Sequence, residues 1–348
     1  MRKRYSALTI AVATGLGLAS GAQANVTFNT FVPGSAISAA EGGNHSTIAF
    51  TYTGTGFVGS VYYGTDNNQL YSTNLSGGNV TQYGGAIPGF SGEVVVGSGL
   101  GQGGFAAGAV YAGNGQGSQI YSVPSSGAPV LFAALPDGGN VRQIFFDPGN
   151  TYGGDMLVTS NQGNVYKINS AGSVSLLASI GADTEGMDIA SSAFGTYAND
   201  LLVASEGTGL IHAITPGGSV GVLPGSFTLA ETVSTVPTDL CSSNNPLQGF
   251  YVANYAVDIQ KADYSQFCAY QGDTIVTGEL GTNSPVTDIH WDGSTYTETL
   301  IGNLPGQSED GIFVTAQRIN DVTTPEPASM ALLGAGLLGL SLVRRKRA

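Results

Sequence analysis

An internal repeat with a period near 45 residues constrains the fold of this chain more than any other feature. Four stretches share one pattern: an apolar strand, a polar Gly/Asn turn, a second strand centred on an aromatic ring or His, another Gly turn, and a third strand opening with Val. The central residues are Tyr71, Tyr121, Tyr166 and His212, spaced 50, 45 and 46 residues apart. Short strands broken by Gly and Asn turns indicate antiparallel sheet. A period of this length holds the four strands of a β-propeller blade.

The repeat predicts an all-β propeller of about six four-stranded blades. The fifth blade is the least clear and falls within residues 228–282. We expect residues 310–319 to form the last strand and to pair with the N-terminal NVTFNTF segment, which closes the ring. A two-sheet sandwich and a right-handed β-helix remain alternatives, although a β-helix repeats about every 18 to 25 residues. The expected inner strands of blades are Ile48–Tyr52, Gln143–Phe146, Met187–Ala190 and Thr287–Trp291.

The distribution of charge narrows the possible partners. Of the 348 residues, 24 are acidic and 11 basic, and seven of the basic residues lie in clusters at the two ends. Residues 25–324 therefore carry 23 acidic and four basic side chains, a net charge of −19. Such a body would be repelled by nucleic acid. It also shows no sustained helical period, which disfavours α/β enzyme folds with crossover helices.

The N-terminal 24 residues have the three parts of a secretory signal peptide. A basic start is followed by an apolar run from Ala7 to about Leu18 and by small residues that end at Ala24. This order predicts cleavage after Ala24 and export. An N-terminal membrane anchor would need a longer apolar stretch. Export places the folded domain, residues 25–322, in an oxidising compartment.

The C-terminal residues 323–348 also form a three-part segment. Pro325-Glu326-Pro327 precedes an uncharged run over 328–343, and Arg344, Arg345, Lys346 and Arg347 follow. At about 1.5 Å per residue this run spans about 24 Å, short of a hydrocarbon core of about 30 Å, so it is a marginal anchor. The basic cluster favours the cytoplasmic side and leaves the Pro-Glu-Pro sequence on the outer face.

This tail resembles the PEP-CTERM sorting signal of Gram-negative bacteria that make extracellular polysaccharide. The resemblance implies a membrane intermediate, recognition by an exosortase, cutting near the motif, and delivery toward the cell surface or extracellular matrix. It makes Pro325, Glu326 and Pro327 a processing signal and not a catalytic site. Met330 stands where the family usually has an aromatic or bulky residue. An ordinary tail anchor is the alternative.

The body also resembles the NHL and regucalcin/gluconolactonase group of propellers, in the stretch TEGMDIASSAFGTYANDLLVASEGTGLIHAI. In gluconolactonase-type propellers acidic metal ligands lie at the channel mouth, and Glu185 matches that family's Glu-Gly sequence. Asp188 belongs to the same acidic cluster, and Glu41-Gly42 and Asp310-Gly311 also precede expected inner strands. Carboxylates and carbonyls of Gly-rich loops suit a hard cation such as Ca²⁺. Solvated acidic loops are the alternative.

The remaining chemistry-bearing residues are few. Cys241 and Cys268 are the only cysteines, and in an oxidising compartment we expect them to pair, with two buried thiols as the alternative. His212 takes a position filled elsewhere by Tyr, which favours a packed ring over a catalytic base. Gly-x-Ser-x-Gly occurs at residues 217–221, but it lies in a Gly turn of the repeat and not between a strand and a helix, so it does not support a hydrolase nucleophile.

Two functional hypotheses follow from these observations. The first is a non-enzymatic surface or matrix propeller that binds polysaccharide, Ca²⁺ or a surface protein. The second is a metal-dependent hydrolase or lyase of the lactonase kind, with Glu185 and its neighbours around a channel-bound cation. The convergence of Glu41, Glu185, Asp288 and Asp310 near the ring axis would support the second.

Overall fold

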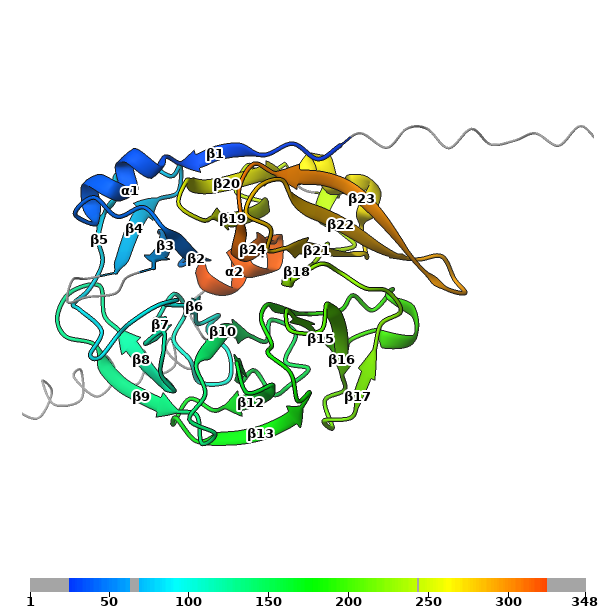
Figure 1. Ribbon diagram of the computed structural model, residues 1–348, viewed down its shortest axis with the longest axis horizontal. Coiled ribbons are helices and arrows are strands. Elements are labelled where there is room, and N and C mark those ends of the chain that lie inside the picture. The colour runs from blue at the N-terminus through cyan, green and yellow to red at the C-terminus, as the bar shows by residue number, and fades with distance from the viewer. Residues whose placement is uncertain (1–24, 63–68, 243, 324–348) are drawn as a thin grey trace, which may run out of the picture.

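The computed structural model describes residues 25–62, 69–242 and 244–323, and these form a six-bladed β-propeller (Figure 1). Each blade is a four-stranded antiparallel sheet. The innermost strands of adjacent blades contact one another in a closed circuit, from β2 through β6, β10, β14, β18 and β24 back to β2. The predicted fold class is therefore confirmed.

The first four blades follow the chain in order, each from its inner to its outer strand. The first blade consists of β2 (Thr47–Tyr52), β3 (Gly56–Val61), β4 (Leu70–Asn74) and β5 (Thr81–Gln82). The second consists of β6 (Val96–Ser98), β7 (Val110–Gly113), β8 (Gln119–Val123) and β9 (Val130–Ala134). The third consists of β10 (Val141–Phe146), β11 (Met156–Ser160), β12 (Asn164–Ile168) and β13 (Val174–Ser179). The fourth consists of β14 (Met187–Ile189), β15 (Leu201–Ser205), β16 (Leu210–Ile214) and β17 (Val220–Val222).

The last two blades are interleaved in the chain. The fifth consists of β18 (Ala230–Thr235), β21 (Thr274–Gly278), β22 (Ser284–Trp291) and β23 (Tyr296–Leu304). The sixth runs from β24 (Ser308–Val314) through β19 (Gly249–Asn254) and β20 (Asp258–Asp263) to β1 (Asn29–Val32). The chain therefore leaves the fifth blade after its inner strand, forms a hairpin in the sixth, and returns.

The structure corrects three predictions. Residues 287–291 lie in β22, the third strand of the fifth blade, and β18 is its inner strand. The last strand ends at Val314, because residues 316–323 form helix α2. The first and last strands do share one sheet, but β19 and β20 separate them, so they close the ring without pairing directly. Figure 1 shows β1 beside β20.

The remaining elements are short helices in the connections. Helix α1 (Gly34–Ala40) follows β1, and α2 (Ala316–Thr323) follows β24. Three 3-10 helices are η1 (Gly195–Tyr197), η2 (Leu240–Ser242) and η3 (Tyr264–Tyr270). Among the described residues no helix is long and apolar enough to cross a membrane.

A disulfide joins the two connections that cross between the fifth and sixth blades. Cys241 lies in η2, on the way from β18 to β19, and Cys268 lies in η3, on the way from β20 to β21. Their Cα atoms are 5.7 Å apart. The predicted pairing is present, and it fixes the base of the inserted hairpin.

Glycines in the outer turns explain how the blades pack so closely. In three blades a Gly with positive φ in the turn between the third and outer strands lies against the blade before it. A Cβ at any of these positions would lie 2.2–2.4 Å from a carbonyl oxygen of the preceding blade's outer strand. Only Gly meets both demands without strain. The pairs are Gly77 with Phe31, Gly172 with Phe132, and Gly218 with Leu177.

The residues at the centre of the sequence repeat all pack within the fold. Tyr71, Tyr121, Tyr166 and His212 occupy the third strands β4, β8, β12 and β16 and are at most 8% exposed. Both ring nitrogens of His212 lack a hydrogen-bond partner, and burial lowers its pKa. These rings therefore form packing between sheets and no open platform for sugars.

Candidate functional site

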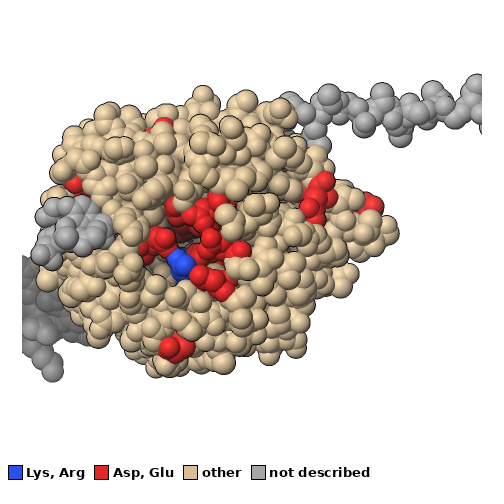
Figure 2. Space-filling view, viewed as in Figure 1, with Lys and Arg blue, Asp and Glu red and all other residues tan. Residues whose placement is uncertain are grey.

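The inner strands all begin at one end of the central channel, and acidic side chains gather there. Because each inner strand begins and each second strand ends at this end, residues at both positions converge around the axis. The cavity they enclose measures about 250 Å³, and Figure 2 shows acidic side chains around a hollow at the middle of the disc. We call this cavity the mouth. Its polar lining consists of Glu93, Arg142, Glu185, Glu206, Glu231, Glu279, Glu309 and Asp310.

Arg142, on the inner strand β10, is the only basic residue in that lining. Its Nη2 donates to Asp183 Oδ2 at 2.8 Å and its Nε to Asp183 Oδ1 at 3.3 Å, while Nε lies 3.1 Å from Glu185 Oε1. Its Nη1 donates to the carboxylate of Glu93. The carboxylates raise the pKa of Arg142 even though burial opposes this. Arg142 therefore neutralises one side of the mouth, formed by Glu93, Asp183 and Glu185.

The other side has no positive partner at ion-pair distance among the described residues. It consists of Glu206, Glu231, Glu279 and Glu309, which we call the uncompensated half. Burial raises the pKa of Glu231 and Glu309 well above the usual value, and neighbouring carboxylates add to the shift. Burial and a hydrogen bond with Glu206 raise the pKa of Glu279 to about 7.

Two carboxylates of the mouth, together with Asp183 beside it, have the spacing that a metal ion requires. Ligand oxygens of Asp183, Glu185 and Glu206 lie within 4.8 Å of one another. Oxygen ligands of this kind suit Ca²⁺ or Mg²⁺. The donor set fits a hard cation, but Arg142 already contacts two of the three residues and would have to share them.

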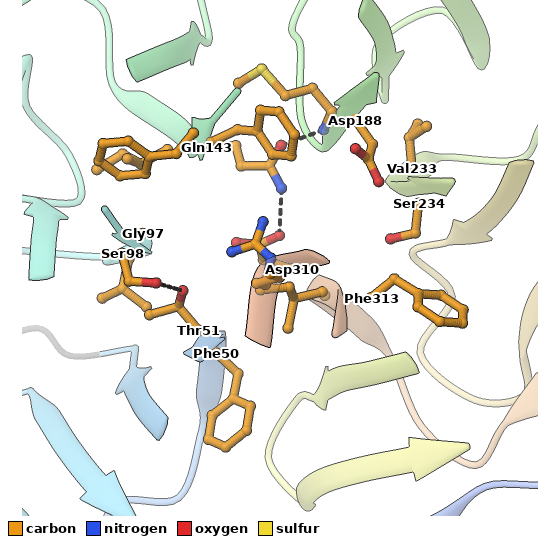
Figure 3. Close-up of a pocket in the computed structure, with 18 residues that line it drawn as sticks. Phe50, Thr51, Gly97, Ser98, Gln143, Asp188, Val233, Ser234, Asp310 and Phe313 are labelled. Atoms are coloured by element: carbon orange, nitrogen blue, oxygen red, sulfur yellow. Dashed lines mark hydrogen bonds between the residues drawn. The ribbon is translucent and has the colours of Figure 1, made fainter. Parts of the chain in front are cut away.

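A second, narrower cavity of about 40 Å³ lies deeper in the channel (Figure 3). Gln143 Nε2 donates to Asp310 Oδ1 at 2.8 Å, and Asp188 accepts the backbone N–H groups of Ile189 at 2.7 Å and Thr235 at 2.8 Å. Burial raises the pKa of Asp188 to about 6 and that of Asp310 to about 7.

Helix α2 closes the channel at the end away from the mouth. Its Arg318 is 8% exposed and faces Asp188, Asp310 and Asp321, while burial lowers the pKa of its guanidinium. Gln317 Nε2 donates to the Pro148 carbonyl at 2.6 Å. The helix therefore caps the ring, and its position in the middle of the disc is visible in Figure 1.

The structure separates the four metal ligands suggested by sequence. Glu185 and Asp310 line the mouth, and Asp188 lines the deeper cavity together with Asp310. Glu41 follows α1 and is buried without a hydrogen-bond partner on either carboxylate oxygen, and it lines neither of these two cavities. Asp288 lies on β22, outside both cavities.

Sequence reasoning missed most of the mouth. Glu231 lies within β18, which was not recognised as an inner strand, and Glu206 and Glu279 directly follow the second strands β15 and β21. A search of the residues that follow each second strand would have found the last two. His290 pairs with Asp273 at 2.8 Å, but neither residue lines the mouth.

Comparison with known sequences identifies the C-terminal segment. The PEP-CTERM protein-sorting motif matches residues 323–347. The chain thus carries the signal of an exported protein that passes through the membrane for sorting, and domains of this type are generally processed by an exosortase. The motif residues Pro325, Glu326, Pro327 and Arg344–Arg347, like the signal peptide, lie outside the described residues. No curated protein sequence matches the chain.

Several solved structures resemble the propeller at low sequence identity. A streptogramin B lyase is 12% identical with a TM-score of 0.48, over 83% of this chain and 92% of that one. A putative gluconolactonase is 10% identical with a TM-score of 0.48, over 82% and 84%. A catalytically inactive virginiamycin B lyase from Staphylococcus aureus with quinupristin is 13% identical with a TM-score of 0.47, over 76% and 73%. Similarity of this degree carries no conclusion about activity. The chain is an exported six-bladed propeller with a PEP-CTERM sorting motif at its C-terminus.

Proposed function

We propose that this protein is a non-enzymatic binding module of the bacterial cell surface or extracellular matrix, and that it binds cations at the mouth of its propeller. An exosortase processes the C-terminal segment and releases the propeller from its membrane intermediate. A bound cation at the mouth can link the propeller to anionic groups of an extracellular polysaccharide.

One observation carries the cation-binding proposal: seven carboxyl groups share the mouth with a single Arg. Glu231 is the clearest case, because the residue is 7% exposed and its carboxylate has no hydrogen-bond or ion-pair partner within the described part of the chain. Burying a carboxylate without a partner costs free energy. A cation supplied from solution would remove that cost.

Titration with Ca²⁺ tests this proposal on the full chain in detergent. We expect millimolar Ca²⁺ to raise the melting temperature by mass action, and we expect the Asp183→Asn/Glu206→Gln variant to lose most of that increase. Glu298→Gln is the matched control, because Glu298 lies on β23 outside the mouth. If millimolar Ca²⁺, Mg²⁺ and a primary amine such as putrescine, each added separately, all leave the melting temperature unchanged, the proposal is wrong.

A metal-dependent hydrolase or lyase is the second candidate, and the grouping of Asp183, Glu185 and Glu206 favours it. A divalent ion there would polarise a carbonyl or lower the pKa of a bound water. No Ser, Cys or His occurs among the described residues that line the mouth, so the metal would have to supply the nucleophile from water. Turnover of a lactone panel by the Ca²⁺-loaded protein, lost in Asp183→Asn/Glu206→Gln, would support this candidate over the first.

A further inference from the structure

The two halves of the mouth differ in what they can bind. Arg142 already occupies the half formed by Glu93, Asp183 and Glu185. The uncompensated half comes mainly from the interleaved fifth and sixth blades, which supply Glu231, Glu279 and Glu309. Gln307 Nε2 donates to Glu309 Oε1 at 2.9 Å and also to Glu279. Glu231 is buried beside them, and none of the residues that the structure describes forms a hydrogen bond or ion pair with its carboxylate.

The spacing of these three glutamates does not suit a single small metal ion. Ca²⁺ lies about 2.4 Å from each ligand oxygen, so the oxygens around it are at most about 4.8 Å apart. Among the described residues, Asp183, Glu185 and Glu206 form the only group of three that meets this limit. A protonated amine donates over about 2.8 Å along tetrahedral N–H bonds, so oxygens bound to one nitrogen lie only about 4.6 Å apart. A ligand whose donors are spread over several atoms reaches oxygens that lie farther apart.

The size of the mouth also favours a ligand larger than an ion. On the same measure of volume a cavity of about 10–15 Å³ holds one water, whereas the mouth measures about 250 Å³. The neighbouring half shows that such a carboxylate cup accepts nitrogen donors, because it holds the Arg142 guanidinium through three acidic residues. A ligand with several N–H donors would complete the other half in the same way.

We infer that the uncompensated half binds a small organic ligand that carries a protonated amine, with Glu231, Glu279 and Glu309 as acceptors for its donors. This inference rests on the proposed cation-binding function and names its ligand class. A primary amine can come from a polyamine or from an amino sugar whose nitrogen is not acetylated. Both sources offer the same ammonium chemistry to the three carboxylates.

Calorimetric titration of the full chain in detergent, at about 150 mM salt, where screening removes weak surface attraction, tests the inference. The probes are putrescine, glucosamine and N-acetylglucosamine, with Ca²⁺ titrated separately. We expect one or both amines to bind and N-acetylglucosamine not to bind, since it lacks the charge. Binding of putrescine alone identifies a polyamine site, and binding of glucosamine alone identifies an amino-sugar site.

Paired variants connect the binding to the named residues. Glu231→Gln and Glu279→Gln/Glu309→Gln should each weaken amine binding at least tenfold, while Glu298→Gln leaves it unchanged. Because these changes remove repulsion, the variants should stay folded, which circular dichroism verifies. Equal amine affinity in the variants and the parent would overturn the inference.

The titration with Ca²⁺ distinguishes failure of the ammonium site from failure of the proposed cation-binding function. If Ca²⁺ raises the melting temperature but neither amine binds, the ammonium site is wrong and the cation-binding function stands. If neither Ca²⁺ nor an amine binds, both are wrong.

Discussion

The two ends of the propeller channel place arginine among carboxylates in contrasting ways. At the closed end, Arg318 projects from α2 toward Asp188, Asp310 and Asp321, and Asp188 also accepts two backbone N–H groups. At the mouth, Arg142 pairs with one side only, and four glutamates face the cavity without a positive partner.

We infer from this difference that one end serves stability and the other serves the proposed binding. Buried charges with partners hold elements together, although they seldom add net stability over apolar packing. Buried charges without partners cost stability and persist where a ligand or reaction uses them. The closed end therefore fixes α2 on the ring, and the mouth is the end where we propose that a ligand binds.

Loss of the closed-end arginine should have the largest effect. Arg318→Met leaves Asp188 and Asp310 without their positive neighbour, and removing one member of a buried charge group costs about 3 kcal/mol. Denaturant unfolding measures the change. Gln317→Ala is the control, because Gln317 is exposed and makes a single contact with Pro148. An unchanged midpoint for Arg318→Met would mean that the charge of Arg318 does not hold α2 on the ring.

The mouth should make stability depend on pH. Glu279 titrates near 7 in the folded chain against 4.5 for an unperturbed Glu, and the pKa values of Glu231 and Glu309 are raised in the same direction. The folded state therefore holds more protons than the unfolded state, so stability is greatest below about pH 4.5 and falls as pH rises toward 7.

Calorimetry between pH 5 and pH 8 should show the melting temperature falling by several degrees. The decrease should be smaller in Glu279→Gln/Glu309→Gln. A melting temperature that rises across this range would contradict the raised pKa values of the glutamates in the uncompensated half.

Removing one carboxylate from each end should have the smallest effects on the free energy of unfolding, and these effects should have opposite signs. Glu231→Gln removes a buried charge without a partner and should stabilise the protein at neutral pH by roughly 1 kcal/mol. Asp188→Asn places an amide where two backbone N–H groups donate and should destabilise it by about 1 kcal/mol. Denaturant unfolding of both variants at pH 7.5 measures the two changes in the free energy of unfolding. Changes of the same sign would contradict the difference drawn between the mouth and the closed end.

The repeat predicted the propeller because the turns and central rings recur locally in four blades. The interleaved blades escaped prediction because the hairpin of β19 and β20 pairs with β24 and β1, strands that are distant in sequence. Helix α2 was also missed, since DGIFVTAQRI reads as one apolar segment and only the last residues turn helical.

The mouth could be predicted only in part for a related reason. Glu185 and Asp310 were found because they adjoin inner strands that the repeat revealed. Predicting Glu206 and Glu279 as part of the mouth requires the ends of the second strands, and predicting Glu231 requires the assignment of β18 as an inner strand. The pairing of Arg142 with Asp183 across two blades follows from ring closure, which no local pattern encodes.

The interleaved topology also sets the order in which the protein can mature. The sixth blade lacks its inner strand until Ser308–Val314 is available, although its hairpin was made some fifty residues earlier in the chain. That strand and α2 immediately precede the sorting motif at residues 323–347. If the chain is exported from its N-terminus, the propeller ring can therefore close only when the sorting motif itself reaches the outer side of the membrane.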